Sequence, residues 1–312
     1  MMPRTLAGVL GVLLLAQPVG AAIQSVSRET GKKYFWSNRC VSLDLFIGDP
    51  PSFATSNSIV LAATKAATAW NPEQSGCGDI ILRVSSNPGG GYIVDFDRRN
   101  TVQFRKDYWG RNHPDPQYRV AHDPSAFALT TVTTINESGE IVDTDVEINA
   151  VKFKWDDLVT NSRPGEIVAD LQNTLTHEFG HVIGLDHNCN DAGMSLVDVS
   201  GARAPSCSGA VPASIRDATM YPRVDRSDIL RRDLGADDLA GLCAIYPRTQ
   251  IADRTSDINA NGNRVCNGYV PGPPDGEGGC AMSHPTHKSP LFGFGLLAGL
   301  FAARCVCTRR RR

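Results

Sequence analysis

The sequence predicts an α/β domain in which strands precede a helix rich in histidine. Five segments show the alternation or the β-branched composition of strands, and two show the apolar spacing of helices. The first helix falls between the first and second strands, and the second helix follows the fifth strand. This order is typical of an α/β sheet domain.

The expected elements can be placed along the chain. The strands are residues 40–47, 79–86, 100–106, 127–135 and 141–149, with the turn NESGE before the last. The first helix spans residues 59–70, and its apolar stripe consists of Ile59, Ala62, Ala63, Ala66, Ala69 and Trp70. A second helical segment is expected from about Ile167.

Composition and charge describe an ordinary globular chain. Of its 312 residues 41% are hydrophobic and 21% charged, which allows one domain of about 200 to 230 residues or two small ones. The formal net charge is −2, so nothing indicates nucleic acid or an anionic membrane as partner.

Residues 1–21 have the pattern of an export signal. Arg4 supplies a positive start, residues 6–16 form an apolar core too short to span a bilayer, and residues 19–21 offer a small-residue cleavage site. The alternative is a buried N-terminal helix. We expect the mature chain to begin near Ala22, outside the cytoplasm.

The composition changes after the predicted domain, residues 22–248. Residues 249–288 are polar and rich in Gly, Asn and Pro, which predicts a flexible linker. Residues 289–312 hold fifteen uncharged residues followed by an arginine-rich end. That stretch falls short of the roughly 20 residues that span a bilayer. We expect a sorting or anchoring tail at a membrane, its arginines on the cytoplasmic side.

Nine cysteines in an exported chain predict disulfides, with no metal-binding pair among them. Three pairs are expected: Cys189–Cys207, which bracket one loop, and, from order along the chain alone, Cys40–Cys77 and Cys243–Cys266. The odd total leaves at least one cysteine with another fate.

The stretch HEFGHVIGLDH, residues 177–187, holds three of the seven histidines. On a helix His177 and His181 stand about 40° apart, one turn from each other, so both imidazoles can bind one zinc ion. Gly184 permits a sharp exit from the helix, because glycine tolerates positive φ. His187 can then return as the third ligand.

Glu178 follows the first of these histidines and can reach a water on the metal without being a ligand itself. Three nitrogen ligands leave a fourth position open, which is the arrangement of a catalytic zinc. The alternative is a helix with chance histidines. The full spacing, with Gly184 in place and in an exported chain, favours the metal site.

This stretch resembles the zinc-binding signature of the metzincin metalloendopeptidases, in their matrixin-like branch. SIRDATMYP, residues 214–222, is similar to the family's methionine turn, with Met220 as the apolar floor beneath the zinc. DDLAGLCAIYP is similar to the closing helix, whose acidic pair, Asp237 and Asp238, would tie it to that turn. The resemblance covers residues 35–247. It implies a twisted, mixed five-stranded sheet, an active-site helix and a small C-terminal subdomain.

The resemblance also implies how a substrate is held and cut. FALTTVTTI would be the edge strand along which a peptide lies by strand addition, and Pro222, Arg223 and Val224 would form the wall of the main specificity pocket. One catalytic zinc would be held by the three histidines, with Glu178 as general base and then general acid. We therefore expect a monomeric, exported zinc endopeptidase acting on polypeptides, secreted or held at the cell surface, with membrane contact through its tail alone.

Two other classes of function stay open. One is a surface adhesion module that keeps zinc without catalysis, although a pure binding module has no need of a base at Glu178. The other is a structural zinc module, which would have four protein ligands.

Two further groups of side chains are expected to be unremarkable in function. Asp143, Asp145 and Glu147 share one side of a strand, which indicates a solvated face; the alternative is a calcium site, for which 6 to 8 oxygens are needed. His113 and His122 are expected to be ordinary surface histidines.

The tail has a resemblance of its own. Cys280, a polar spacer, an apolar stretch and terminal arginines are similar to the C-terminal sorting tails of myxobacterial surface proteins. In those tails the cysteine is the processing position, which makes Cys280 a candidate for the unpaired cysteine. The alternative is a disulfide to Cys266.

Overall fold

The computed structural model describes residues 22–248, with gaps at 49, 72–75, 88–93, 95, 112–116, 118, 162–164, 192–194 and 226. The described residues all belong to one compact unit, Met1–Pro271. The predicted signal peptide, linker and tail, with Cys266 and Cys280, lie outside the described residues. None of the helices in the described ranges has the length and apolar character to cross a membrane.

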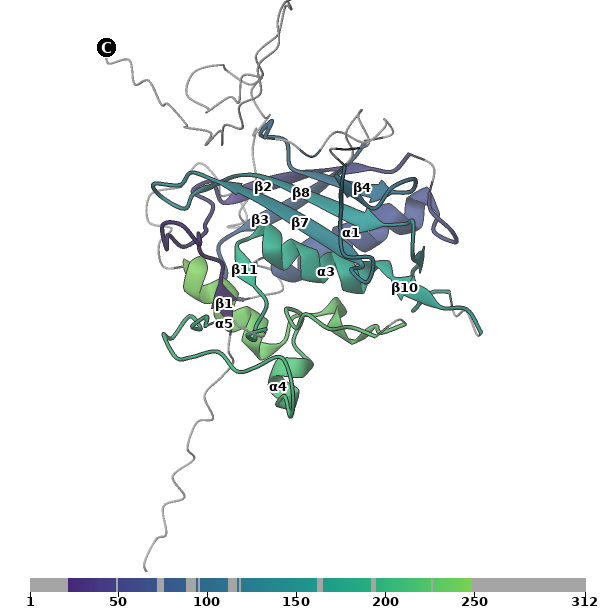
Figure 1. Cartoon of the computed structure of the whole chain (residues 1–312). Helices are drawn as coiled ribbons and strands as arrows, with labels where there is room; N and C mark the ends of the chain where they lie inside the picture. The colour runs from purple at the N-terminus through teal and green to yellow at the C-terminus, as the bar shows by residue number, and fades with distance from the viewer. Residues whose placement is uncertain are drawn as a thin grey trace, which may run out of the picture. The chain divides into compact units, whose positions relative to one another are not determined.

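A mixed five-stranded sheet forms the centre of the molecule, as the α/β prediction requires (Figure 1). Its order is β3 (Ile81–Asn87), β2 (Cys40–Phe46), β4 (Thr101–Arg105), β8 (Ile141–Asn149) and β7 (Ala128–Thr134). Four strands run parallel, and β7 pairs antiparallel with β8 at one edge. The short connection between β7 and β8 dictates the antiparallel pairing.

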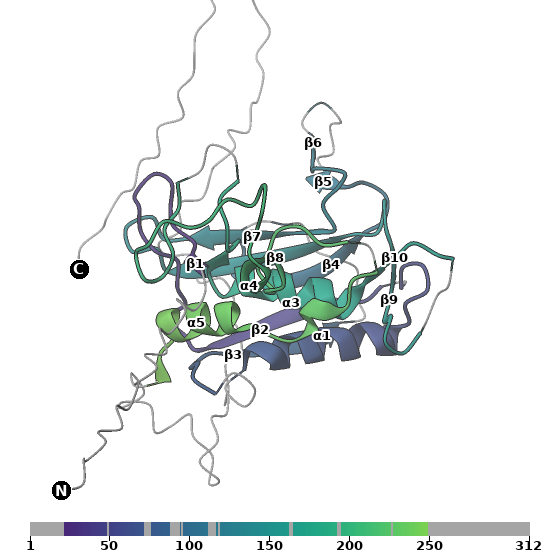
Figure 2. The same ribbon diagram turned by 90° about the horizontal axis from the view of Figure 1, so that it is seen from below.

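Two helices lie side by side on one face of this sheet (Figure 2). Helix α1 (Ser56–Trp70) begins at a capping box made by Thr55 and Ser58. Its buried stripe consists of Ile59, Ala62, Ala63, Ala66, Ala67 and Trp70, while Ala69, expected in the stripe, is half-buried. The Trp70 indole donates to the carbonyl of Thr176, 2.9 Å away, and so ties α1 to helix α3 (Leu171–Val182).

Helix α3 begins four residues later than the sequence predicts. Residues Val168–Asp170 form strand β10, which pairs in parallel with β9 (Lys154–Asp156). Asp170 caps the helix, because its side chain accepts a 2.8 Å hydrogen bond from the Asn173 amide. The same carboxylate binds the Arg232 guanidinium, with Nε 2.9 Å from Oδ1. The cap therefore fixes the start of the histidine-bearing helix.

Short elements complete the unit. Strand β1 (Ile23–Gln24) pairs with β11 (Leu185–Asp186), and β5 (Gly110–Arg111) pairs with β6 (Val120–Ala121). After His187 the chain is largely irregular, with helix α4 (Ala213–Arg216), a 3-10 turn η2 (Leu230–Arg232) and helix α5 (Ala236–Ile245). The predicted small C-terminal subdomain corresponds to this segment, which belongs to the same compact unit as the sheet.

Disulfides join the irregular segment to itself and to the sheet. The predicted Cys189–Cys207 pair is confirmed, with Cα atoms 5.0 Å apart. The predicted Cys40–Cys77 and Cys243–Cys266 pairs are wrong, because Cys77 is bonded to Cys243. The end of α5 lies against the start of β3, where the Asp79 amide donates to the Tyr246 carbonyl at 2.8 Å. Cys40 is disulfide-bonded as well.

The acidic face of β8 is buried, so the predicted solvated face is wrong. Asp143, Asp145 and Glu147 are 1%, 4% and 0% exposed. Amides of Asp97 and Arg98 donate to Asp143, the Thr101 hydroxyl donates to Asp145, and Arg105 pairs with Glu147. Burial raises the pKa of Asp143 to about 6 and that of Asp145 to about 7.

His122 is also not an ordinary surface residue. Its Nε2 lies 3.2 Å from Oε2 of the buried Glu147, and its ring meets that of Trp109 edge-on at 4.9 Å. The loop after β6 therefore packs on the sheet through this side chain. His113 lies outside the described residues.

Candidate metal centre

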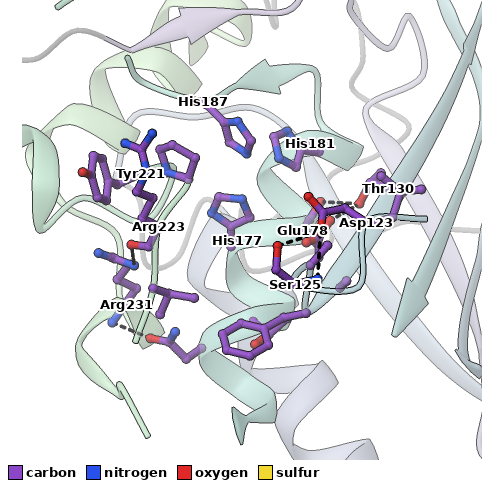
Figure 3. Close-up of a pocket in the computed structure, with 18 of the residues that line it drawn as sticks. Asp123, Ser125, Thr130, His177, Glu178, His181, His187, Tyr221, Arg223 and Arg231 are labelled. Carbon is purple, nitrogen blue, oxygen red and sulfur yellow. Dashed lines mark hydrogen bonds between the residues drawn. The ribbon is translucent and has the colours of Figure 1, made fainter. Parts of the chain in front are cut away.

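Three histidines converge in the lining of a cavity (Figure 3). His177 and His181 project from α3, and His187 comes from the chain just after β11. One ligand atom from each lies within 4.8 Å of the others. In the part of the chain that the structure describes, no other group of three His, Cys, Asp or Glu side chains meets this condition. The calcium alternative at β8 therefore gains no support, whereas this cluster could hold a metal ion.

The turn that returns His187 to the cluster depends on Gly184. Its φ is +90°, and a Cβ there would lie 2.9 Å from the Tyr34 carbonyl oxygen. The Ser25 amide donates to the Gly184 carbonyl at 2.9 Å, next to the β1–β11 pair. Strand β1 thus holds the turn between the second and third histidines.

Backbone carbonyls orient the two helical imidazoles. His177 Nδ1 lies 2.6 Å from the Thr219 carbonyl oxygen, and His181 Nδ1 lies 2.8 Å from that of Leu185. A carbonyl only accepts, so each Nδ1 carries a proton, and Nε2 is the nitrogen left to face a metal. Burial, and then the neighbouring histidines, lower the pKa of His177 to about 3 and that of His187 to about 2. Neutral imidazole is the metal-binding form, so the donor set fits a cation.

Glu178 stands on the same helix and lines the same cavity. Its residue is 5% exposed, and burial raises the pKa of its carboxyl group. The hydroxyl of Thr130, on β7, donates to Oε2 at 2.6 Å (Figure 3). A proton-accepting group therefore lies beside the histidines with one oxygen already hydrogen-bonded.

Met220 packs against the histidine-bearing helix α3, in a turn fastened to α5. It is 2% exposed and packs on Gly180, where a Cβ would overlap its sulfur. Asp238 accepts hydrogen bonds from the amides of Thr219 and Met220 at 2.8 and 2.9 Å. Its neighbour Asp237 accepts from the Asn188 amide group at 2.8 Å. Asp238 therefore makes the expected tie to this turn, whereas the hydrogen bond of Asp237 goes to Asn188.

The cavity has a volume of about 1130 Å³ and is bounded by β7 and by the segment after Met220. Pro222, Arg223 and Val224, which the resemblance assigns to the wall of the specificity pocket, are among the residues that line it. Arg223 pairs with Asp191 at 3.1 Å and also donates to the Cys207 carbonyl. The wall is thereby attached to the disulfide-closed loop.

Two residues that matter to this cavity were missed by sequence reasoning. Arg231 donates to the carbonyls of Arg223 and Arg216, each at 2.8 Å, and supports the wall. Thr130 reaches Glu178 across 48 positions of sequence. Strand alternation could have assigned Thr130 to one face of β7, but no local pattern connects it to Glu178 or Arg231 to the wall.

Comparison with known proteins assigns no family to the chain. The chain matches no protein-family model, and a search of curated proteins gives no significant relative. The chemical content of the site therefore rests on its own geometry: three converging imidazoles, one buried carboxyl group beside them, and the cavity that they line.

Proposed function

We propose that this chain is a zinc-dependent endopeptidase of matrixin-like metzincin fold. The observation that carries the proposal is the meeting of three histidines with Glu178 in a cavity bordered by β7, the last strand of the sheet. The sheet order, with an antiparallel edge strand next to the histidine-bearing helix, supports the fold assignment.

Zinc is the metal that suits this donor set best. Imidazole nitrogen is a preferred zinc ligand, and three protein ligands with an open fourth position distinguish catalytic from structural zinc. His177, His181 and His187 would hold the ion. When bound, zinc would polarise the scissile carbonyl and lower the pKa of a water to about 7.

The chain's own residues supply proton transfer and alignment. Glu178 accepts a proton from the attacking water and delivers it to the nitrogen of the leaving amine. Strand β7 offers its outer edge to an extended peptide, and strand addition fixes the peptide's direction and register. A side chain of that peptide would enter the cavity beside Pro222, Arg223 and Val224.

We further propose that the protein works outside the cytoplasm as a monomer. Two disulfides among the described cysteines, with Cys40 bonded as well, fit an oxidising compartment. Residues 1–21 would direct export, and residues 289–312 would anchor the enzyme or sort it to the cell surface.

Chelation with metal add-back tests the proposed function. Purified full-length protein is incubated with denatured casein, with a zinc chelator, and with chelator followed by zinc or calcium. We expect cleavage that chelation abolishes and zinc restores, while calcium alone does not. Cleavage that survives complete removal of metal would contradict the proposal, and a zinc-loaded protein without cleavage would favour the adhesion module.

A further inference from the structure

We propose that Thr130 is a positioning residue for Glu178, whose hydroxyl group holds one carboxyl oxygen in place and leaves the other to accept the proton of water. The inference rests on the proposed function, since it assigns Thr130 a part in the same reaction. It concerns β7, the strand expected to bind the substrate backbone, and gives it a second task.

The geometry of the hydroxyl group identifies its acceptor. Thr130 Oγ1 lies 2.6 Å from Glu178 Oε2 and 3.4 Å from the Glu178 carbonyl oxygen. A hydroxyl has one proton to donate, and 2.6 Å is the length of a strong O–H···O contact to a carboxyl oxygen. The Glu178 side chain is therefore the partner.

Among the described residues, the Thr130 hydroxyl group is the one hydrogen-bond donor that orients the Glu178 carboxyl group. Across the described ranges, no donor other than Thr130 bonds to the Glu178 side chain. The last torsion of a glutamate is broad and roughly two-fold, so an unrestrained carboxyl group samples many orientations. Holding Oε2 selects one of them. Figure 3 shows the Thr130 side chain pointing at Glu178 from the neighbouring strand.

The placement of Thr130 couples the carboxyl group to the peptide-binding edge. Thr130 pairs with Val146 of β8 on its inner side, and β7 is the last strand of the sheet. Its backbone is fixed by the sheet while its hydroxyl fixes Glu178. A peptide that adds to the outer edge of β7 is thus aligned with the group that activates the water.

The proton balance keeps Thr130 unchanged. Water gives one proton to Oε1 of Glu178 as its oxygen bonds to the carbonyl carbon, and that proton passes to the amine nitrogen as the C–N bond breaks. Throughout, the Thr130 hydroxyl donates to Oε2 and keeps its own proton.

Substitutions on β7 isolate the hydroxyl group. Thr130→Val keeps the shape and strand preference but removes the donor, and Thr130→Ala removes it with less bulk. Thr130→Ser restores it. Thr64→Val is the control, because Thr64 is an exposed threonine of helix α1 and does not line the cavity.

The measurement is steady-state hydrolysis of a fluorogenic peptide by each full-length, zinc-loaded variant, together with zinc content. We expect Thr130→Val and Thr130→Ala to lower kcat about 10- to 100-fold, the worth of a hydrogen bond to a charged group. KM should stay within about twofold and zinc near one per chain, because the backbone edge and the histidines are untouched. Thr130→Ser and Thr64→Val should stay near the parent enzyme.

Several results would overturn the inference. One is an unchanged kcat in both hydroxyl-free variants. Another is a loss of kcat in those variants that Thr130→Ser does not share. A third is a change in KM alone, which would mean that Thr130 only contacts the peptide. In those cases the proposed function stands as long as Glu178→Gln is inactive. A zinc-loaded parent protein that cleaves no peptide would overturn both proposals together.

Discussion

The histidine-lined cavity has two sides, and each side is stabilised by different interactions. On one side, β7 and α3 belong to a sheet-and-helix layer fixed by strand ladders and by the alanine-rich contact of α1. On the other, the segment after His187 has little regular structure and is fixed by disulfides and by side chains that bind its backbone. Two histidines and Glu178 come from the first side; His187 and the pocket wall come from the second. The proposed proton-transfer group thus lies on the regular side, and the proposed wall of the substrate pocket lies on the irregular side.

Removing each disulfide measures how much the irregular side depends on covalent links. Cys77–Cys243 joins positions 166 apart and connects α5 to the sheet, whereas Cys189–Cys207 joins positions 18 apart within one loop. In the chain-entropy model the double serine variants should lose about 5 and about 3 kcal/mol of unfolding free energy. Guanidinium unfolding of the two variants checks the order. A larger loss for the short loop would mean that local contacts, not chain entropy, dominate.

Substitution of Asp238 measures how much the hydrogen bonds of the irregular side contribute to its stability. Its carboxyl group accepts from the amides of Thr219, Met220 and Gly235 while fully buried. Asp238→Ala leaves those three donors without an acceptor, at a cost of about 3 kcal/mol. We expect a lower melting temperature and weaker zinc binding, because the Thr219 carbonyl orients His177. Asp217→Ala, at an exposed acid, is the control and should change neither quantity.

The sequence could predict the regular side of the cleft better than the irregular side. Alternation in residues 141–149 and the apolar stripe after Ile59 are local patterns, and the strands they predict lie within two residues of those observed. The histidine spacing likewise predicts one face of a helix and a glycine turn, since both follow from backbone geometry.

What the sequence could not predict depends on contacts between distant residues. The Cys77–Cys243 bond requires knowing that α5 returns to the start of β3. The environment of Asp145 requires knowing that β4 pairs with β8 and brings the Thr101 hydroxyl to its carboxyl group. Alternation correctly predicted that these acids share one face of the strand. It could not predict whether that face is buried, because side chains alternate every two residues on solvated and buried polar faces alike.

The buried acids of β8 predict that the free energy of unfolding depends on pH. The pKa of Asp145, raised by burial to about 7, exceeds its unfolded value of 3.8, so the native state holds this proton more tightly. Its contribution to stability is fully present below about pH 4 and is lost as pH rises through 7. Asp145→Asn should therefore gain about 1 to 3 kcal/mol over the parent between pH 5 and pH 8. Thermal unfolding at the two pH values, with Asp217→Asn alongside, checks this. Equal pH slopes in parent and variant would contradict it.

The most direct test of the central claim pairs two substitutions one helical turn apart. Glu178→Gln keeps size and hydrogen bonding but cannot accept a proton, and His181→Ala removes one ligand. We predict that Glu178→Gln retains about one zinc per chain while peptide turnover falls at least 10²- to 10⁴-fold. His181→Ala should lose both metal and activity. Near-normal turnover by Glu178→Gln at full zinc occupancy would contradict the account, because Glu178 would then not be the group that takes the proton from water.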